Sequence, residues 1–192
     1  MDDLARVVAS ERPRQALFLL AHSMGGAIAI LFALSSGQGL RGLVLSAPMT
    51  NLGNAAPEWL IQASQLLGRY VPRLPTTRVP FSYVSRDPQV VARFYADPLV
   101  YHRRVSAHTG AELVRATREI DVHMERLSLP LLIMHGTEDR VVDVRGSRQL
   151  YARAQSSDRT LKLYDGLYHH ILNEPEKDRV LDDIVGWLDA HL

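Results

Sequence analysis

Residues 17–34 read LFLLAHSMGGAIAILFAL, and this stretch decides the fold of the chain. It is long enough to be a candidate membrane-spanning helix, for which about 18 apolar residues suffice. A histidine, a serine and two glycines interrupt it at residues 22–26, and each glycine costs a helix about 1 kcal/mol relative to alanine. We therefore divide it into a buried strand over residues 16–21, a turn over residues 22–25 and an apolar helix over residues 26–35.

Three further apolar runs lie between helical patterns. The runs are residues 40–46, 129–135 and 160–164. The additional helices that we predict are residues 1–10, 144–154 and about 175–191, the last with Pro175 near its start. Because the apolar runs do not alternate with polar residues, they predict parallel strands that are covered on both faces. The predicted fold class is α/β, with a mostly parallel sheet and flanking helices.

Composition indicates a single globular chain. Its 192 residues are 46% hydrophobic and carry 22 Lys and Arg against 21 Asp and Glu, which excludes a disordered chain. A formal net charge of +1 gives no reason to expect nucleic acid as a partner. The absence of cysteine excludes disulfides and cysteine-ligated metals. The first residues, MDDL, do not resemble a secretory signal, so the expected location is the cytoplasm.

The succession of apolar runs and helical patterns is interrupted between residues 51 and 128, a segment that contains six prolines. Asp87–Pro88 and Asp97–Pro98 are each typical of an N-cap followed by proline at the first helical position. We predict that residues 51–128 form a helical cap or lid. This cap would be inserted between the two parts of a core domain, residues 1–50 and residues 129–192.

Residues 68–104, within the predicted cap, are basic and aromatic. They contain seven Arg and two acidic residues, a local net charge of +5, and six of the chain's 13 aromatic residues. Two interpretations stay open. In the first, this segment covers an apolar site and contacts an anionic lipid surface as a peripheral protein does. In the second, its Arg head groups lie in water and their aliphatic stems pack on the core.

Ser23 lies on the turn between the first strand and the following helix, where a nucleophile elbow belongs. Such a turn strains the serine backbone and needs small residues two positions before and after it, here Ala21 and Gly25. The resulting A-x-S-x-G pattern departs from G-x-S-x-G by one methyl group. The turn directs the N–H of Met24 at an oxyanion. We interpret His22 as a buried, hydrogen-bonded residue that points away from this site.

A serine nucleophile needs a base and an orienting acid, and in α/β-hydrolases the chain order is serine, acid, histidine. The acid follows a strand, which favours Asp139 over Glu138 and Asp143. The loop after the last strand offers two candidate bases, His169 and His170.

A metal site is the alternative for a chain with eight histidines. The adjacent His169 and His170 are expected to diverge, and neither H-x-x-x-H nor H-E-x-x-H occurs. Glycine-rich nucleotide-binding loops do not occur either. We therefore expect no metal and no cofactor.

Four motifs, in their order along the chain, resemble the monoacylglycerol lipase group of α/β-hydrolases, bacterial members especially. They are FLLAHSMGG (18–26), LVLSAP (43–48), LLIMHGTEDRVVD (131–143) and LYDGLYHHILNEPEK (163–177), and SRDPQVVARFYADPLVYH (85–102) in the cap extends the likeness. The resemblance implies Ser23 as nucleophile, Asp139 as acid, His169 as base and the Met24 N–H as one oxyanion donor. It also implies hydrolysis of a monoacylglycerol or another long-chain acyl ester through an acyl-enzyme. His170 stands where the family often has glutamate.

One departure from the family concerns the part that precedes the nucleophile strand. Members carry further strands there and an HG-type loop that supplies the second oxyanion donor, so we expect this donor to be absent from the chain. His135–Gly136 is a different HG pair and cannot replace it. Loss of one donor typically lowers turnover about 100- to 1,000-fold. The first strand would then be an exposed edge through which the chain could self-associate.

Three functions follow. The first is a monoacylglycerol lipase-like serine hydrolase. The second is a lysophospholipase or general carboxylesterase. The third is a truncated, non-catalytic α/β-hydrolase-fold chain that acts as a binding domain.

Overall fold

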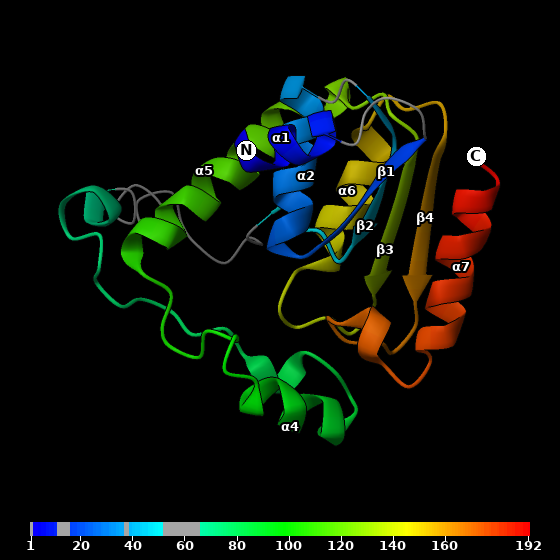
Figure 1. The fold of residues 1–192 in the computed structure, drawn as a ribbon. Coiled ribbons are helices and arrows are strands. Elements are labelled where there is room, and N and C mark those ends of the chain that lie inside the picture. Colours follow the sequence, from blue (N-terminus) through cyan, green and yellow to red (C-terminus); the bar gives the residue numbers. More distant parts are fainter. Residues whose placement is uncertain (1, 11–15, 37–38, 52–65) are drawn as a thin grey trace.

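Four parallel strands form the centre of the chain (Figure 1). The computed structural model describes residues 2–10, 16–36, 39–51 and 66–192. Within them the strands are β1 (Leu17–His22), β2 (Leu40–Ser46), β3 (Leu131–Gly136) and β4 (Arg159–Tyr164). They pair in the order β1-β2-β3-β4, and all three pairs are parallel. The predicted α/β class with a parallel sheet is therefore confirmed.

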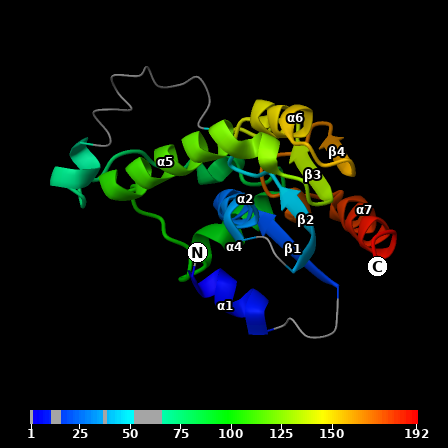
Figure 2. The same cartoon turned by 90° about the horizontal axis from the view of Figure 1, so that it is seen from above.

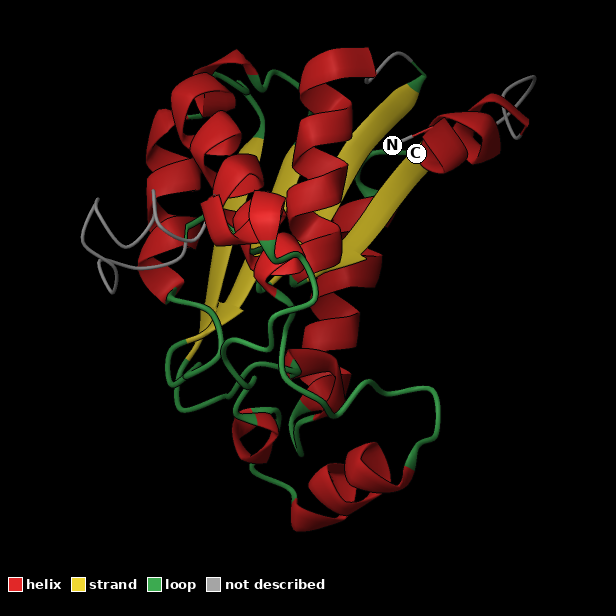
Figure 3. Cartoon of the chain, turned by 90° about the vertical axis from the view of Figure 1, so that its left-hand side faces the viewer, coloured by secondary structure: helices red, strands yellow, loops and turns green. Residues whose placement is uncertain are grey.

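Helices cover both faces of the sheet (Figures 2 and 3). The helices with described bounds are α1 (Asp2–Ser10), α2 (Met24–Ser36), α4 (Pro88–Ala96), α5 (Ala107–His123), α6 (Val144–Arg153) and α7 (Lys177–Asp189). Three short 3-10 helices are η1 (Phe81–Tyr83), η2 (Met124–Arg126) and η3 (Ile171–Asn173). α2 and α6 pack on one face of the sheet, whereas α7 covers the other.

The two central strands are buried on both faces, which explains why their sequences do not alternate. Leu43 and Leu45 of β2 belong to the apolar cluster beneath α2 and α6. Val44, between them, belongs to the cluster beneath α7. Ile133 and Leu132 of β3 divide between the same two clusters. A strand with helices on both faces needs apolar side chains at every position.

The stretch over residues 17–34 divides into strand, turn and helix as predicted. β1 ends at His22 and α2 begins at Met24, so Ser23 alone forms the turn for which four residues were predicted. None of the helices in the described part of the chain combines the length and the apolar character that a bilayer crossing requires.

Two predicted helix starts differ from the structure. Asp97–Pro98 begins a turn in which the N–H of Leu99 donates to Asp97 Oδ1 at 2.8 Å, and no helix follows directly. At the end of the chain, η3 intervenes, and Pro175 lies before α7, which begins at Lys177 with Glu176 as its N-cap. In both places proline follows an acidic residue and stabilises a turn, which short sequence patterns do not distinguish from a helix start.

The predicted cap is described in part, because residues 52–65 lie outside the described ranges. α4 begins as predicted, since Asp87 accepts the N–H of Gln89 at 2.8 Å and proline is the first helical residue. This helix lies beyond the carboxyl ends of the strands (Figure 1). α5 instead packs along α2 and contributes Ile120 to the core. The domain boundaries at residues 51 and 128 stay a prediction.

Candidate active site

Ser23 lies on a strained turn directly after β1. Its φ of 54° is in the left-handed region, which L-residues rarely adopt outside constrained sites. Backbone hydrogen bonds hold this conformation in place. The N–H of Ser23 donates to Ser46 O at 3.0 Å. Ser23 O accepts from Gly26 N at 2.9 Å, Met49 N at 3.0 Å and, more weakly, Ala27 N at 3.4 Å. The backbone at the end of β2 and in the loop after it therefore fixes the position of Ser23.

The close approach at this turn involves Gly26 rather than Gly25. A Cβ on Gly26 would lie 2.8 Å from Pro48 Cβ, whereas a Cβ on Gly25 would meet no atom of the described residues within 4 Å. The expectation that Gly25 must be small is therefore wrong. The helix begins against the loop that follows β2, and this packing determines at which glycine a side chain would collide.

Three side chains that are distant in the sequence form one hydrogen-bonded chain. The Ser23 hydroxyl lies 2.9 Å from His169 Nε2, and His169 Nδ1 lies 2.7 Å from Asp139 Oδ2. They come from the loops that follow β1, β3 and β4. Because parallel strands end at the same edge of a sheet, these loops meet there. The structure thus brings together the three residues that the sequence singled out.

Gly136, at the end of β3, allows the acid loop and the histidine loop to meet. A Cβ on this residue would collide with the carbonyl oxygens of Leu167 and Tyr168. The two loops are also joined by backbone bonds, with Thr137 N to Tyr164 O at 2.9 Å and Glu138 N to Leu167 O at 3.0 Å. The histidine loop can therefore approach Asp139 closely because no side chain separates them.

The Asp139 carboxylate is completely buried and accepts several hydrogen bonds. Oδ1 accepts from the N–H groups of Val141 and Val142 at 2.7 and 2.9 Å. Oδ2 accepts from His135 and His169. Burial by itself would raise the pKa of Asp139, but the hydrogen bonds from the two histidines outweigh it and hold the pKa well below its usual range. The group is therefore an anion that can orient an imidazole.

His135 is a residue of this site that the sequence reasoning missed. Its fully buried ring places Nε2 3.0 Å from Asp139 Oδ2 and 3.2 Å from Val142 O. Both are acceptors, so Nε2 carries the proton, and Nδ1 accepts from Ser147 Oγ at 2.7 Å. The available signal was a histidine at the end of β3, four residues before the acid.

His22 is hydrogen-bonded, as predicted, but it does not point away from the site. Its Nδ1 lies 3.1 Å from Ser46 O, and its ring centroid lies 4.7 Å from that of His169 and 4.9 Å from that of His170. Burial, together with the two neighbouring imidazoles, lowers the pKa of His22 to about 3. The chain turns in the left-handed region at Ser23, and both His22 and Ser23 lie against His169 of the histidine loop.

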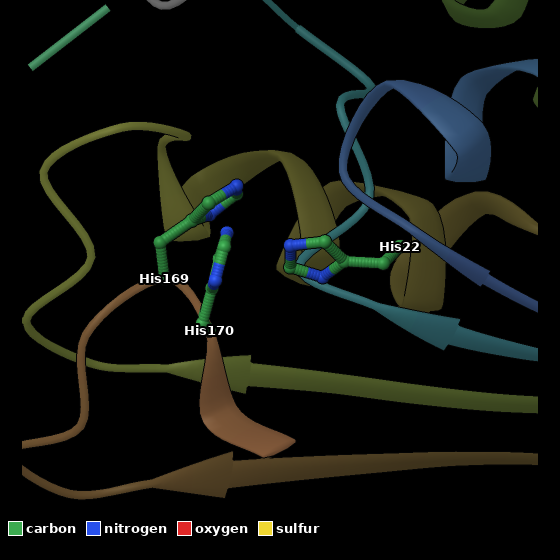
Figure 4. Close-up of side chains that lie close together, drawn as sticks. All are labelled: His22, His169 and His170. Atoms are coloured by element: carbon green, nitrogen blue, oxygen red, sulfur yellow. The ribbon is translucent and has the colours of Figure 1, made fainter. Parts of the chain in front are cut away.

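The adjacent rings of His169 and His170 do not diverge, contrary to the sequence argument. Their centroids are 5.4 Å apart, and both face His22 (Figure 4). His170 is held by its N–H, which donates to Val84 O at 2.7 Å, and by an edge-on contact with Phe94 of α4. Burial, and then the neighbouring His169, lower the pKa of His170 to about 4. Within the described residues, the cluster of His22, His169 and His170 is the group that could hold a metal ion.

Met24 is the first residue of α2, directly after the serine. The first N–H groups of a helix have no acceptor within the helix, and the helix dipole adds partial positive charge there. The Met24 N–H is therefore available to an anion that forms beside Ser23 Oγ. This N–H is the one oxyanion donor that the sequence analysis expects within the chain.

The parallel sheet, the strained serine turn and the hydrogen-bonded side chains at one sheet edge define the class of an α/β-hydrolase. The family model Hydrolase_4, described as "Serine aminopeptidase, S33", matches residues 1–176, and the chain belongs to this family.

Within this class the chain is similar to monoacylglycerol lipases, which confirms the predicted resemblance. It is 36% identical to the monoacylglycerol lipase of Mycolicibacterium smegmatis over 98% of this chain and 68% of the relative. The monoglyceride lipase of Rattus norvegicus is also 36% identical, over 96% of this chain and 62% of the relative. The chain thus spans about two thirds of the length of these relatives.

Solved structures of monoacylglycerol lipases are also similar to the chain. The crystal structure of the Paleococcus ferrophilus monoacylglycerol lipase has a TM-score of 0.89 and 28% identity, over 100% of this chain and 74% of that one. A soluble variant of the Saccharomyces cerevisiae monoglyceride lipase, in complex with a substrate analog, has a TM-score of 0.81 and 24% identity, over 99% of this chain and 66% of that one. The second likeness concerns the fold alone.

Proposed function

We propose that the chain is a serine carboxylic-ester hydrolase that cleaves monoacylglycerols to fatty acid and glycerol. The observation that carries this proposal is the hydrogen-bonded chain from Ser23 through His169 to Asp139. A hydroxyl is a weak nucleophile unless a base accepts its proton, and a base is efficient when a third group orients it. The names of the relatives support the ester substrate.

In the proposed reaction, Ser23 Oγ attacks the ester carbonyl carbon while its proton passes to His169 Nε2. The buried Asp139 carboxylate stabilises the resulting imidazolium and holds its tautomer. The tetrahedral intermediate then expels the glycerol oxygen, which takes the proton from His169, and an acyl-enzyme remains. Water then attacks the acyl carbon while His169 takes its proton. The bond from the acyl carbon to Ser23 Oγ breaks, His169 returns the proton to Oγ, and the fatty acid leaves.

The intermediate carries its negative charge on the former carbonyl oxygen. The Met24 N–H at the start of α2 is the donor that we assign to this oxyanion. This assignment agrees with the position of the helix start, one residue after the nucleophile.

A lysophospholipase or general carboxylesterase is the second candidate, and the basic segment over residues 68–104 favours it. A lysophospholipid carries an anionic phosphate that an Arg-rich segment would attract. Arg86 of this segment, however, already pairs with Glu174 and Glu176. The segment's contact with a lipid surface, the cytoplasmic location and self-association at β1 stay predictions.

Labelling with a fluorophosphonate tests the nucleophile. We expect the chain to react in a 1:1 ratio and Ser23→Ala to be unreactive, because the probe requires an activated serine. Equal labelling of both proteins would overturn the proposal. Absence of labelling in both would favour the non-catalytic binding domain.

Substrate class is tested with a monoacylglycerol and a lysophospholipid of equal acyl-chain length. We expect a higher kcat/KM for the monoacylglycerol. The opposite preference, lost in Ser23→Ala, would establish the lysophospholipase instead.

A further inference from the structure

Three histidine rings face one another at the carboxyl end of the sheet (Figure 4). His22 comes from the end of β1, and His169 and His170 come from the loop after β4. One ring nitrogen from each lies within 4.8 Å of the other two. The proposed hydrolysis uses His169 only, so His22 and His170 have no part in it.

In two of these rings the hydrogen bonds leave Nε2 without a proton. His22 Nδ1 lies 3.1 Å from both Ser46 O and Ser46 Oγ. The hydroxyl can donate or accept but the carbonyl oxygen can only accept, so we assign the proton to Nδ1 and leave Nε2 unprotonated. His22 Nε2 is buried and has no hydrogen-bond partner among the described residues. His169 Nδ1 donates to Asp139, which likewise leaves Nε2 unprotonated. Neither nitrogen has to lose a proton before it binds a cation.

The outer partners of these rings are those of histidines in metal sites. A metal-bound histidine usually donates its other N–H to a carboxylate or a backbone carbonyl, which orients the ring and raises its basicity. Asp139 does this for His169, and the Ser46 carbonyl does it for His22. His22 and His169 therefore both make the outer hydrogen bond that a metal-bound histidine usually makes.

The donor set indicates which kind of ion would bind. Three imidazoles suit Zn²⁺, Cu²⁺ or Ni²⁺, whereas Mg²⁺ and Ca²⁺ require oxygen ligands. Zinc binds imidazole nitrogen at about 2.0–2.1 Å, which places nitrogens of a tetrahedral site about 3.4 Å apart. The nitrogens therefore have to approach one another by about 1.4 Å at most. His22 and His170 are only partly buried as residues.

We propose that His22, His169 and His170 form a binding site for a divalent transition-metal ion of the zinc type, and that this ion switches off hydrolysis. The ion would coordinate His169 Nε2 and so break the hydrogen bond from Ser23. The serine would keep its proton and could not attack an ester. The binding site stands on the histidine geometry, and its inhibitory effect rests on the proposed hydrolase function.

Titration calorimetry with Zn²⁺ alone tests the site without any assay of activity. We expect the chain to bind one ion, and His170→Phe to bind at least about 10-fold more weakly, since even the loss of an outer partner weakens metal sites about 10- to 100-fold. His108→Phe is the matched control, because His108 is an exposed histidine of α5 outside the cluster. Equal affinity of His170→Phe and wild type, or no 1:1 binding by wild type, would overturn the site.

Hydrolysis of a short-chain ester tests the switch. Zn²⁺ should inhibit wild type, a chelator should restore the rate, and Mg²⁺ should have no effect. The Zn²⁺ concentration for half inhibition should rise about 10-fold or more in His170→Phe, as its affinity falls. Inhibition of His170→Phe at the wild-type Zn²⁺ concentration would overturn the switch.

The two experiments separate the failure of each proposal. Zinc binding that depends on His170, in a chain that hydrolyses no ester without Zn²⁺, would uphold the metal site and overturn the proposed hydrolase. If His170→Phe does not fold, His22→Gln replaces it, because this substitution removes the unpaired Nε2 from the same cluster. Unchanged Zn²⁺ affinity in His22→Gln would overturn the site.

Discussion

The two sides of the His169 ring differ in how completely their polar groups are paired. On the Asp139 side, the buried carboxylate accepts from His135, His169 and the valine N–H groups of residues 141 and 142. On the other side, His22 Nε2 has no partner among the described residues, and the ring of His170 makes only ring contacts there. Ser23 is the group that hydrogen-bonds to His169 Nε2 on this side.

This difference separates the two tasks of the site. A base must be held in one tautomer, and a closed network of hydrogen bonds in a medium of low dielectric constant does this. The opposite side must admit a substrate, so fixed partners cannot fill it. The unpaired nitrogen of His22 therefore lies where a ligand would arrive. This is also why a cation could compete for His169.

Asp139→Asn breaks the paired side and has the largest expected effect. The asparagine amide would present an N–H₂ group to the histidines, and His169 would then carry its proton on Nε2, where it cannot act as base. We expect kcat for a short-chain ester to fall about 1,000- to 10,000-fold. Urea denaturation shows whether the variant is folded, and a folded variant that keeps a tenth of the wild-type kcat would contradict the proposed role.

His135→Leu tests whether the paired side needs its second histidine. Loss of one hydrogen bond to the carboxylate should lower kcat about 10- to 100-fold with little change in KM, because bonds to charged groups contribute about 1.5–3 kcal/mol.

Two further variants serve as controls for His135→Leu. His135→Gln retains an N–H donor and should recover part of kcat, whereas Ser147→Ala affects only the outer nitrogen and should have a smaller effect. A fall in stability with unchanged kcat in His135→Leu would show a purely structural role.

Glu174→Gln tests how the histidine loop is held to the segment before α4. The buried Glu174 carboxylate accepts from Arg86 N and Nε at 2.9 and 2.8 Å and from Tyr168 N at 3.3 Å. We expect the free energy of unfolding to fall by about 2 kcal/mol, because a buried donor loses its acceptor. The half-exposed Glu176, which pairs with the same arginine, provides the control. Glu176→Gln should cost less than about 1 kcal/mol, and equal losses would refute the argument from burial.

The smallest effect is expected at the two glycines beside Ser23. Gly26→Ala would press a Cβ against Pro48 and should lower the free energy of unfolding by about 1 kcal/mol, after the gain in helix propensity. Gly25→Ala adds a Cβ that has no neighbour within 4 Å in the described part of the chain, and it should raise the free energy of unfolding by up to about 1 kcal/mol. Changes of the same sign in urea denaturation would show that Pro48 does not set the position of this turn.

The strands, the main helices and the three side chains of the proposed triad could be predicted from sequence, and the reason is local. Burial on both faces leaves unbroken apolar runs, and parallel strands bring their following loops to one edge. Ser23, Asp139 and His169 each follow such a run, so their proximity follows from strand direction alone. Short proline patterns such as Asp97–Pro98 were less informative, because turns and helix starts share the same capping chemistry.

What the sequence determined by itself was therefore the type and order of the elements and which loops meet. The tertiary structure decided which side chains within those loops touch. The pairing of His135 with Asp139, the orientation of His22 toward the histidine loop and the contact of Gly26 with Pro48 depend on it. The first contact depends on how the short loop after β3 folds back on the strand. The other two join segments that are distant in the sequence and lie at the left-handed turn of Ser23. Neither feature leaves a periodic signal in the residues nearby.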